Sequence, residues 1–388
     1  LFYLNNDFIK RKIMKKILKV FIPPVIVYLY NRLPIHSLKM YWFKNKSNFT
    51  LDNELKKMID FFIKSKSYKL MSNYWNYLNI KNLKQIKEKN IENYSTTIAK
   101  NYYTWVDVKD EQIEQTILNV QNVTTSEKVN LYKKQINMSY TDSMKYNNLT
   151  YLLYLNLKKL DLLDKLNYLS DEGYLTYNDP FLEINEHNIS TDKLNSIIDY
   201  ENINKFSSIS HKKNILEIGA GSGRTSQAIL TFNKDLKYTI CDIPPALFIS
   251  YERLKNVFKN KKVGLLYSLN EDELINKINS YDISFIMPHQ LNFLKNKNFD
   301  LTIAIDCIHE MDKETIKKYF YNINRFSKLF YFSVWKKTSV PFSGVLRRNS
   351  NNLDYFSNDY QIPQNWEKIY EKDLIFPSNF ISSGYQIK

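Results

Sequence analysis

Glycine is rare in this chain, with seven glycines among 388 residues. Three of the seven, Gly219, Gly221 and Gly223, alternate within residues 214–223. Glycine loses more backbone freedom on folding than any other residue, so a chain that has few is expected to keep them where a positive φ or close approach of a ligand requires one. Residues 219–223, here called the glycine turn, are therefore the first candidate for a functional site.

Cysteine and long apolar runs are also scarce. Cys241 and Cys307 both lie in apolar strand-like segments, which predicts buried free thiols in a reducing compartment and excludes a disulfide framework. No segment approaches the roughly 18 to 20 apolar residues of a membrane-spanning helix. The longest candidate, 20–30, contains two prolines, and no small-residue cleavage site follows it. The sequence predicts a cytoplasmic protein.

Metal-ligand clusters are absent as well. The chain has five histidines, and no group of His, Cys, Asp and Glu shows the spacing of a metal site. We therefore predict no metal. Aromatic residues, in contrast, make up 15% of the chain, which excludes a disordered protein.

Positive charge is concentrated at the start of the chain. The net charge is +15, and residues 1–50 hold ten Lys or Arg against one acidic residue, which supplies +9 of it. This bias suggests an anionic partner, either nucleic acid or the inner face of the cytoplasmic membrane. We interpret 1–45 as a basic amphipathic segment lying on the membrane surface. An ordinary helix packed on the main domain stays an equal alternative.

The next region, 46–200, has helical spacing and is predicted to be a cap that contributes to substrate binding. Leu55, Met58, Ile59 and Phe62 recur at i, i+3 and i+4, and 50–165 shows no strand-length alternation. Its aromatic stripe, which includes Trp75, is interpreted as core rather than as a platform for sugars. The region is expected to be all helical.

A connector leads from the cap to the glycine turn. Residues 177–180 predict a turn, and Ser190 is the expected N-cap of a helix that runs through Ile197. This connector could line the same cleft as the glycine turn. Asn178, Asp192 and Arg224 are the candidates for contacts with a substrate, although Asp192 could instead serve only the helix dipole.

From residue 201 to 388 the pattern alternates between strand and helix. Near-continuous apolar strands separated by helices predict a parallel sheet covered on both faces, an α/β fold. The tail is predicted to add an antiparallel pair, 366–376 and 380–386, at one edge. The expected parallel strands are 215–218, 237–242, 283–287, 301–306 and 329–334, and 263–267 is ambiguous.

The spacing of the glycine turn excludes two nucleotide motifs. A dinucleotide fingerprint needs two residues between its second and third glycines, and only Ser222 stands there. A P-loop needs Gly-Lys-Ser/Thr, which is absent. The remaining pattern, with Glu217 before alternating glycines, resembles the first motif of class I methyltransferases that use S-adenosylmethionine (SAM). The resemblance implies a Rossmann-like methyltransferase sheet, SAM as cofactor, and contact of Glu217 with the amino end of its methionine moiety.

Other strand ends supply candidate partners for the cofactor. Asp242 closes the second strand 23 positions after Gly219, near the roughly 20-residue spacing of an acid that binds ribose hydroxyls. Ile243 follows it, and a helix N-cap is the alternative role of Asp242. Met287 and Pro288 end the third strand, where adenine is expected.

The fourth strand ends in Asp306 and is followed by the catalytic candidates His309 and Glu310. Methyl transfer to a hydroxyl needs a base to take the proton of the alcohol. A histidine with a pKa of about 6.5 is largely neutral at physiological pH and suits this role. We predict His309 as the base, oriented by Glu310 or Asp306. Asp306 is also a candidate for cofactor contact.

Three segments, 215–224, 238–247 and 309–311, resemble a bacterial family of sugar O-methyltransferases associated with surface polysaccharide gene clusters. The resemblance spans about 72–366. It implies that the acceptor is a sugar hydroxyl on a nucleotide-linked or lipid-linked glycan. The chain departs from that family at His309, where Gln is frequent.

Other functions stay open. The charge allows a nucleic-acid methyltransferase, but the strand ending in Asp306 lacks the Asn/Asp-Pro-Pro-aromatic signature of enzymes that methylate base amino groups, so no nucleic acid is expected. Another small-molecule hydroxyl is a further alternative. A non-catalytic scaffold of a glycan assembly complex is disfavoured by the complete set of Glu217, the glycine turn and Asp242.

Overall fold

The protein is represented by a computed structural model. The chain divides into two units after Ser47, and every residue that the structure describes lies in the second, Asn48–Lys388. The predicted membrane-surface segment and Asn178 lie outside the described residues. These are 52–66, 68, 71, 75, 78–79, 82–83, 86, 110–130, 140–173, 182–340, 353–356 and 360–388.

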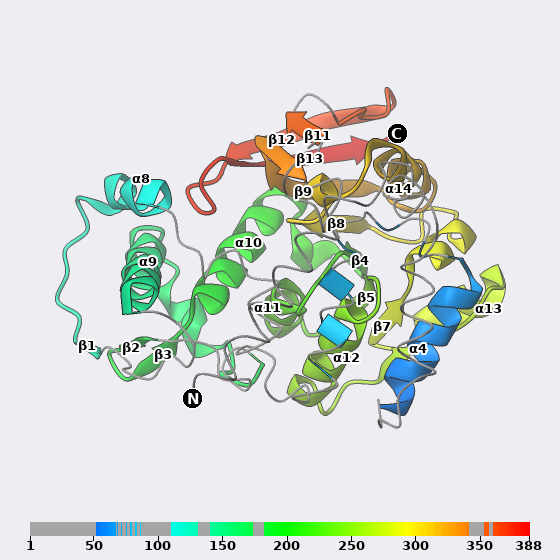
Figure 1. Cartoon of the computed structure of the whole chain (residues 1–388), viewed down its shortest axis with the longest axis horizontal. Helices are drawn as coiled ribbons and strands as arrows, with labels where there is room; N and C mark the ends of the chain where they lie inside the picture. The colour runs from blue at the N-terminus through cyan, green and yellow to red at the C-terminus, as the bar shows by residue number, and fades with distance from the viewer. Residues whose placement is uncertain are drawn as a thin grey trace, which may run out of the picture. The chain divides into compact units, whose positions relative to one another are not determined.

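An eight-stranded sheet forms the centre of this unit (Figure 1). Its strand order is β12-β13-β9-β8-β4-β5-β7-β6. The six strands from β9 to β6 are parallel, and β13 runs antiparallel to both β9 and β12. The predicted fold class, a Rossmann-like α/β sheet preceded by helices, is confirmed, as is the antiparallel pair at its edge. The strands are β4 (Asn214–Ile218), β5 (Lys237–Cys241), β6 (Val263–Leu265), β7 (Ile283–Ile286), β8 (Leu301–Ile305), β9 (Leu329–Trp335), β12 (Trp366–Asp373) and β13 (Phe380–Ile387).

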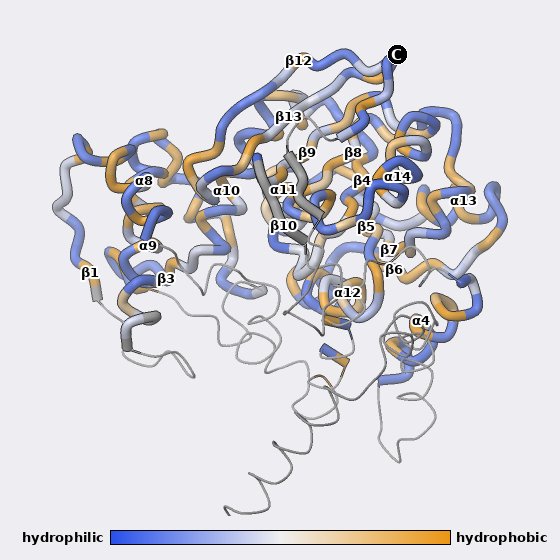
Figure 2. The backbone as a smooth tube through the Cα atoms, turned by 45° about the horizontal axis from the view of Figure 1, so that its top comes forward, coloured by the Kyte–Doolittle hydropathy of each residue, from blue (hydrophilic) through white to orange (hydrophobic). Residues whose placement is uncertain are grey.

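Helices cover both faces of the sheet. On one face, α10 (Thr191–Ser207), α11 (Arg224–Phe232) and α12 (Ala246–Val257) pack against β9, β4 and β7 respectively. On the other, α13 (Glu271–Ser280) and α14 (Lys313–Phe326) share a buried core with the strands. All five residues of β8 are buried, which explains its unbroken apolar run. Figure 2 shows hydrophobic residues gathered along these strands.

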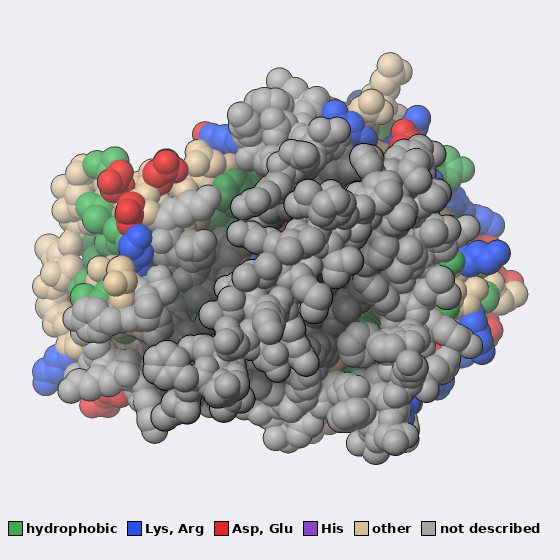
Figure 3. Space-filling model, viewed as in Figure 1, with side chains coloured by type: hydrophobic (Ala, Val, Ile, Leu, Met, Phe, Trp, Pro, Cys, Tyr) green, Lys and Arg blue, Asp and Glu red, His purple; other side chains and the backbone are tan. Residues whose placement is uncertain are grey.

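The helical region before the sheet contains α4 (Asn53–Lys64), α8 (Asp110–Val120) and α9 (Tyr140–Lys159). The i, i+3, i+4 pattern in α4 is confirmed, since Leu55, Met58, Ile59 and Phe62 are all buried. A two-residue strand, β1 (Val129–Asn130), also lies here and pairs with a later hairpin, β2 (Leu182–Ile184) and β3 (His187–Ile189). The helical pattern did not predict it, because two residues are too few to show alternation. Figure 3 shows acidic and hydrophobic side chains over α8.

Helix α10 connects this region to the sheet. Ser190 is its N-cap, as predicted, and accepts a bond from the Lys193 amide at 3.2 Å. Nearly every residue from 191 to 203 is buried. The predicted domain boundary between 200 and 201 falls inside this helix, so a boundary there would cut one continuous element. The division into cap and cofactor domain stays a prediction.

The chain order of the strands locates the candidate site. From β4 the chain moves to β5 and on to β6 at the edge of the sheet, comes back to β7 between them, and then crosses to β8 on the opposite side of β4. Ligands of open parallel sheets bind at the carboxyl ends of the strands where the order reverses. Here that point lies between β4 and β8. It brings together the glycine turn and the short helices η6 (Pro288–Phe293) and η7 (Ile308–Glu310) that follow β7 and β8.

Candidate functional site

The glycine turn follows β4 directly and has the backbone that its sequence predicts. Gly219, Gly221 and Gly223 have φ of 71°, 56° and 77°. A Cβ on Gly219 would lie 2.6 Å from Cβ of Cys307, so this glycine is required by packing against the chain after β8. A Cβ on Gly221 would meet nothing within 4 Å. The turn is thus packed at its first glycine and open at its second.

Asp242 fixes the open part of the turn. Its Oδ2 accepts a bond from the Gly221 amide at 2.9 Å, and its Oδ1 accepts one from the Ile243 amide at 2.7 Å. Burial raises the pKa of Asp242 to about 7, although both amide bonds oppose the rise. The structure therefore brings together Gly221, Asp242 and Ile243, all predicted as cofactor contacts. Each carboxylate oxygen has more than one lone pair, so Asp242 can accept hydroxyl hydrogen bonds in addition to these two.

Glu217 lies below the turn. Its carboxylate accepts bonds from the hydroxyls of Ser226 and Tyr238, the latter at 2.8 Å, and the residue is 2% exposed. Burial raises its pKa. These two bonds hold the carboxylate between β4, β5 and α11. Contact of Glu217 with a cofactor stays a prediction. Neither partner was singled out from the sequence.

Arg224, the first residue of α11, forms a buried ion pair. Its Nη1 donates to Oδ2 of Asp199 at 2.7 Å, and both side chains are nearly enclosed. Burial alone would lower the pKa of Arg224, but the charges of Asp199, Asp192 and then Asp306 outweigh it and raise the pKa. The structure thus brings Asp192 and Arg224 together with Asp306. Asp199 was missed, although its i, i+7 spacing from Asp192 placed both on one face of α10.

Asp306 stands at the end of β8 with a φ of 57°. Its amide donates to the carbonyl oxygen of Ser333 at 2.9 Å, which holds it against β9. Burial raises the pKa of Asp306 to about 7 despite the opposing charge of Arg224. The carboxyl group lies 3.3 Å from Nε2 of His309, with Oδ1 as the nearer oxygen.

His309 is enclosed. The residue is 3% exposed, and its ring lies against Trp335 and Phe380, with centroids 6.4 and 5.8 Å away. Burial lowers its pKa to about 3, so the imidazole is neutral. Its Nδ1 has no hydrogen-bond partner among the residues that the structure describes. The role of His309 as base stays a prediction, and its burial and weak basicity disfavour it.

Glu310, in contrast, is partly exposed and reaches toward the helical region. Its Oε2 accepts a bond from the indole Nε1 of Trp75 at 2.7 Å. Burial raises the pKa of Glu310 well above its ordinary value, and the charges of Asp306 and Asp242 add to the rise. Trp75, interpreted from the sequence as core, is therefore a polar contact at the carboxyl edge of the sheet.

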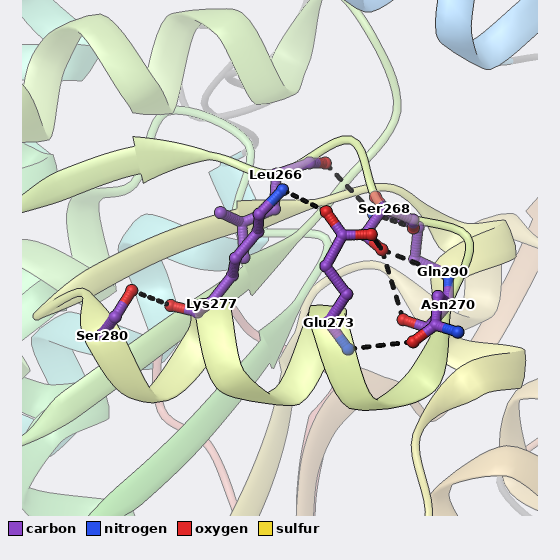
Figure 4. A network of polar contacts seen from close by, with 7 residues as sticks. All are labelled: Leu266, Ser268, Asn270, Glu273, Lys277, Ser280 and Gln290. Carbon is purple, nitrogen blue, oxygen red and sulfur yellow. Dashed lines mark hydrogen bonds and ion pairs between the residues drawn. The ribbon is translucent and has the colours of Figure 1, made fainter.

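Met287 and Pro288 follow β7, and the nearby Gln290 bonds to the backbone of the chain after β6, at Leu266 and Ser268 (Figure 4). Oε1 of Gln290 accepts from the Met287 amide at 2.8 Å, and its Nε2 donates to the carbonyls of Leu266 and Ser268 at 3.1 and 3.0 Å. The neighbouring His289 packs on Phe61 of α4, with ring centroids 4.8 Å apart. These hydrogen bonds and the ring contact join β7, the chain after β6, and α4 around the predicted adenine position.

Arg253, a buried residue that the sequence analysis did not single out, bonds to the glycine turn. Arg253 of α12 donates to Ser222 at 3.2 Å and to Oε1 of Gln227 at 3.1 Å. Nε2 of Gln227 donates in turn to the carbonyl oxygen of Glu172 at 2.8 Å. A Cβ on Gly173 would lie 2.4 Å from Oε1 of Gln227. The turn, α11, α12 and the connector from the helical region are therefore tied together.

Among the described residues at this edge, acidic groups outnumber basic ones. Asp242 follows β5, and Asp306 and Glu310 both follow β8, whereas the neighbouring Arg224 is already paired with Asp199. Such an arrangement favours a cationic ligand. Within the described residues, no group of three or more His, Cys, Asp or Glu could hold a metal ion.

No protein-family model matches the chain, and no curated protein matches it. The chain is similar to a SAM-dependent methyltransferase from Clostridium acetobutylicum, at 12% identity over 51% of this chain and 91% of that one, with a TM-score of 0.32. It is similar to another from Aquifex aeolicus, at 13% identity over 49% and 90%, with a TM-score of 0.30. The N-methyltransferase NodS from Bradyrhizobium japonicum gives 14% identity over 49% and 96%, with a TM-score of 0.32. Identities and TM-scores this low carry no argument about activity or substrate. The fold class rests on the strand order of the chain itself.

Proposed function

We propose that the protein is a SAM-dependent O-methyltransferase that transfers a methyl group to a sugar hydroxyl during surface polysaccharide biosynthesis. The observation that carries the proposal is the pairing of the open Gly221 backbone with Asp242 at the reversal point of the sheet. A nucleoside can approach a backbone without side chains there, and a carboxylate is in place for its ribose hydroxyls. Ile243, Met287 and Pro288 are the proposed contacts of its base.

The charge at the site supports a sulfonium cofactor. SAM carries a positive sulfur, and Asp242, Asp306 and Glu310 together supply the complementary negative charge. The bound cofactor would supply an electrophilic methyl group. Asp306 and the Arg224 pair then border the methionine end, and the segment after β8 faces the reacting atoms. His309 and Glu310 are the groups of that segment that could take the proton from an acceptor hydroxyl.

The sugar acceptor rests on the resemblance of three segments to the sugar O-methyltransferases, and the helical region is the proposed source of acceptor contacts. Asp192 and Arg224 lie at its junction with the sheet. The acceptor would be a glycan carried on a nucleotide or a lipid. The positively charged segment before the described residues supports a peripheral position on the inner membrane face. Among described residues, no helix has the length and apolarity to cross a membrane.

Calorimetric titration with SAM tests the cofactor. Binding to the wild type, and loss of that binding in Gly221→Asp, is expected, because the new carboxylate would fill the open approach beside Asp242. Ser222→Asp is unsuitable as a control, since Ser222 receives the Arg253 bond. Glu367→Gln on β12 is a better one, because its side chain is half exposed. If titration of the wild type with SAM produces no heat, the result would favour the alternative of a non-catalytic scaffold.

Mass spectrometry of surface glycans with and without the gene tests the acceptor. The expected result is the loss of 14 mass units, one methyl in place of one hydrogen, from a sugar of the glycan. SAM binding with unchanged glycans would point instead to nucleic acid or another small-molecule hydroxyl.

A further inference from the structure

The bond between Trp75 and Glu310 joins two parts of the chain that are 235 residues apart. Glu310 lies on η7, directly after β8, and its side chain is partly exposed. Trp75 belongs to the helical region, where acceptor contacts are proposed. The indole places one carboxyl oxygen at 2.7 Å from its nitrogen and thereby fixes the direction of the side chain.

His309, the alternative base, is enclosed, with 3% of its surface exposed. Its ring is enclosed by Trp335, Phe380 and the carboxyl group of Asp306. A base must reach the proton that it removes, and its pKa should lie near the working pH. With a pKa lowered to about 3 by burial, His309 meets neither requirement.

We propose that Glu310 is the proton acceptor of the methyl-transfer reaction and that Trp75 positions its carboxylate. This inference rests on the proposed function. The hydroxyl proton passes to the Glu310 carboxylate while the hydroxyl oxygen bonds to the methyl carbon. The carbon–sulfur bond breaks and its electron pair stays on sulfur. One methyl ether, one neutral thioether and one protonated carboxyl group result, so atoms and charge balance.

The charges around Glu310 favour this sequence of events. Within the part of the chain that the structure describes, Asp306 and Asp242 are the charged groups that act on it, and the Trp75 indole donates a hydrogen bond to it. Burial and the two carboxylates raise its pKa, whereas a bound sulfonium would lower it and favour the ionised base. Once the methyl group has left, the positive charge on sulfur is gone. The carboxyl group then holds its proton more tightly.

The pairing can be measured without an acceptor. In the full-length protein with ¹⁵N-labelled indoles, Trp75→Phe assigns the Trp75 signal. That signal is expected to move with pH, with a midpoint well above the ordinary Glu value of about 4.3, and Glu310→Gln should abolish the movement. The Trp366 indole donates to Asn324 at 2.9 Å and serves as an internal control, since its partner does not titrate. A Trp75 signal that is constant from pH 4 to 9 overturns the pairing.

The base role needs a transfer assay. An envelope extract from cells lacking the gene serves as acceptor, with methyl-labelled SAM as donor. Glu310→Gln is expected to lower the rate by about 10²-fold or more, the scale of general-base catalysis, while calorimetry still detects SAM binding. Trp75→Phe should lower the rate about tenfold. It should also move the acid limb of the rate profile to higher pH, because loss of the indole bond raises the pKa of Glu310.

Trp366→Phe is the matched control, because it also loses an indole bond but lies on β12. Its pH profile should equal that of the wild type. A wild-type rate in Glu310→Gln overturns the base role and leaves the proposed function intact. If the wild type transfers no label at all, the proposed function is overturned and the base role with it.

Discussion

Gly219 and Gly221 differ in whether the structure has room for a Cβ atom. Gly219 has no room for a Cβ, since Cys307 lies 2.6 Å from the position it would take, whereas Gly221 faces open space. Both have positive φ. The two positions look alike in the sequence, and only the distance to Cys307 separates a packing role from a binding role.

Alanine at these two positions should therefore have different effects. Gly219→Ala is expected to lower the free energy of unfolding by about 2–4 kcal/mol, from overpacking and backbone strain together. Gly221→Ala should cost about 1–2 kcal/mol for its φ alone but weaken SAM binding. Urea denaturation and calorimetry measure the two quantities. Equal losses of stability in both variants would contradict this assignment.

Protonation of Asp242 should make both the stability of the protein and its affinity for SAM depend on pH. Its pKa is about 7 in the folded protein and 3.8 ordinarily, so the folded state holds this proton more tightly than the unfolded state. Stability of the unliganded protein should then fall as pH rises from about 4 to about 7 and level off above. SAM affinity should rise over the upper part of that range, because the ionised carboxylate favours a cation.

Asp242→Asn is the control for the pH dependence of stability and for the pH dependence of SAM affinity. The variant should reduce the pH dependence of stability and of SAM affinity without removing either, because Asp306 has a pKa of about 7 as well. Chemical denaturation and calorimetry at several pH values make the measurement. Slopes that are identical in the variant and the wild type would rule out titration of Asp242.

At the scale of elements, the site depends on bonds between helices. Arg253 joins α12 to the glycine turn through Ser222 and to α11 through Gln227. Gln227 continues to the connector at Glu172. Three elements that are separate in the sequence are thus held in one arrangement around the turn by buried polar groups.

Arg253→Met should disturb that arrangement. The substitution keeps much of the volume but removes the bonds to Gln227 and Ser222, and a loss of about 2–3 kcal/mol in the free energy of unfolding is expected. SAM affinity should fall as well. Lys255→Met on the same helix changes an exposed side chain and should stay within about 0.5 kcal/mol of the wild type. The interpretation fails if the two variants lose equal stability.

At the scale of the whole molecule, positive charge and binding site are separate in the sequence. Residues 1–50 carry ten basic side chains, whereas the site in Asn48–Lys388 is acidic at its edge. This separation fits a protein whose basic segment finds an anionic surface and whose sheet binds a cationic cofactor.

Deletion of residues 1–33 should shift the protein from the membrane fraction to the soluble fraction. Basic residues near an anionic membrane contribute about 1 kcal/mol each, and seven of the ten lie in this segment. SAM affinity of the remaining chain should be unchanged. Replacement of Lys12, Lys15 and Lys16 by Gln keeps the length and should produce part of the shift. An unaltered distribution would favour the alternative of a helix packed on the main domain.

The sequence by itself determined the sheet and the backbone of the site. Apolar runs separated by helices, glycines at alternate positions and acids at strand ends are local features, and local sterics and periodicity decide them. The strands at 237–241, 301–305 and 329–335 accordingly agree with those predicted to within one residue. Asp242 and Asp306 followed from strand ends in the same way.

Only the tertiary structure decided which side chains face the site. Trp75 reaches Glu310 across 235 residues, and His309 is buried against Trp335 and Phe380, which belong to two other strands. No local pattern encodes such contacts, because they depend on which strands become neighbours and which face each side chain takes. Burial then sets the pKa values that separate a neutral, enclosed histidine from a carboxyl group that can accept a proton.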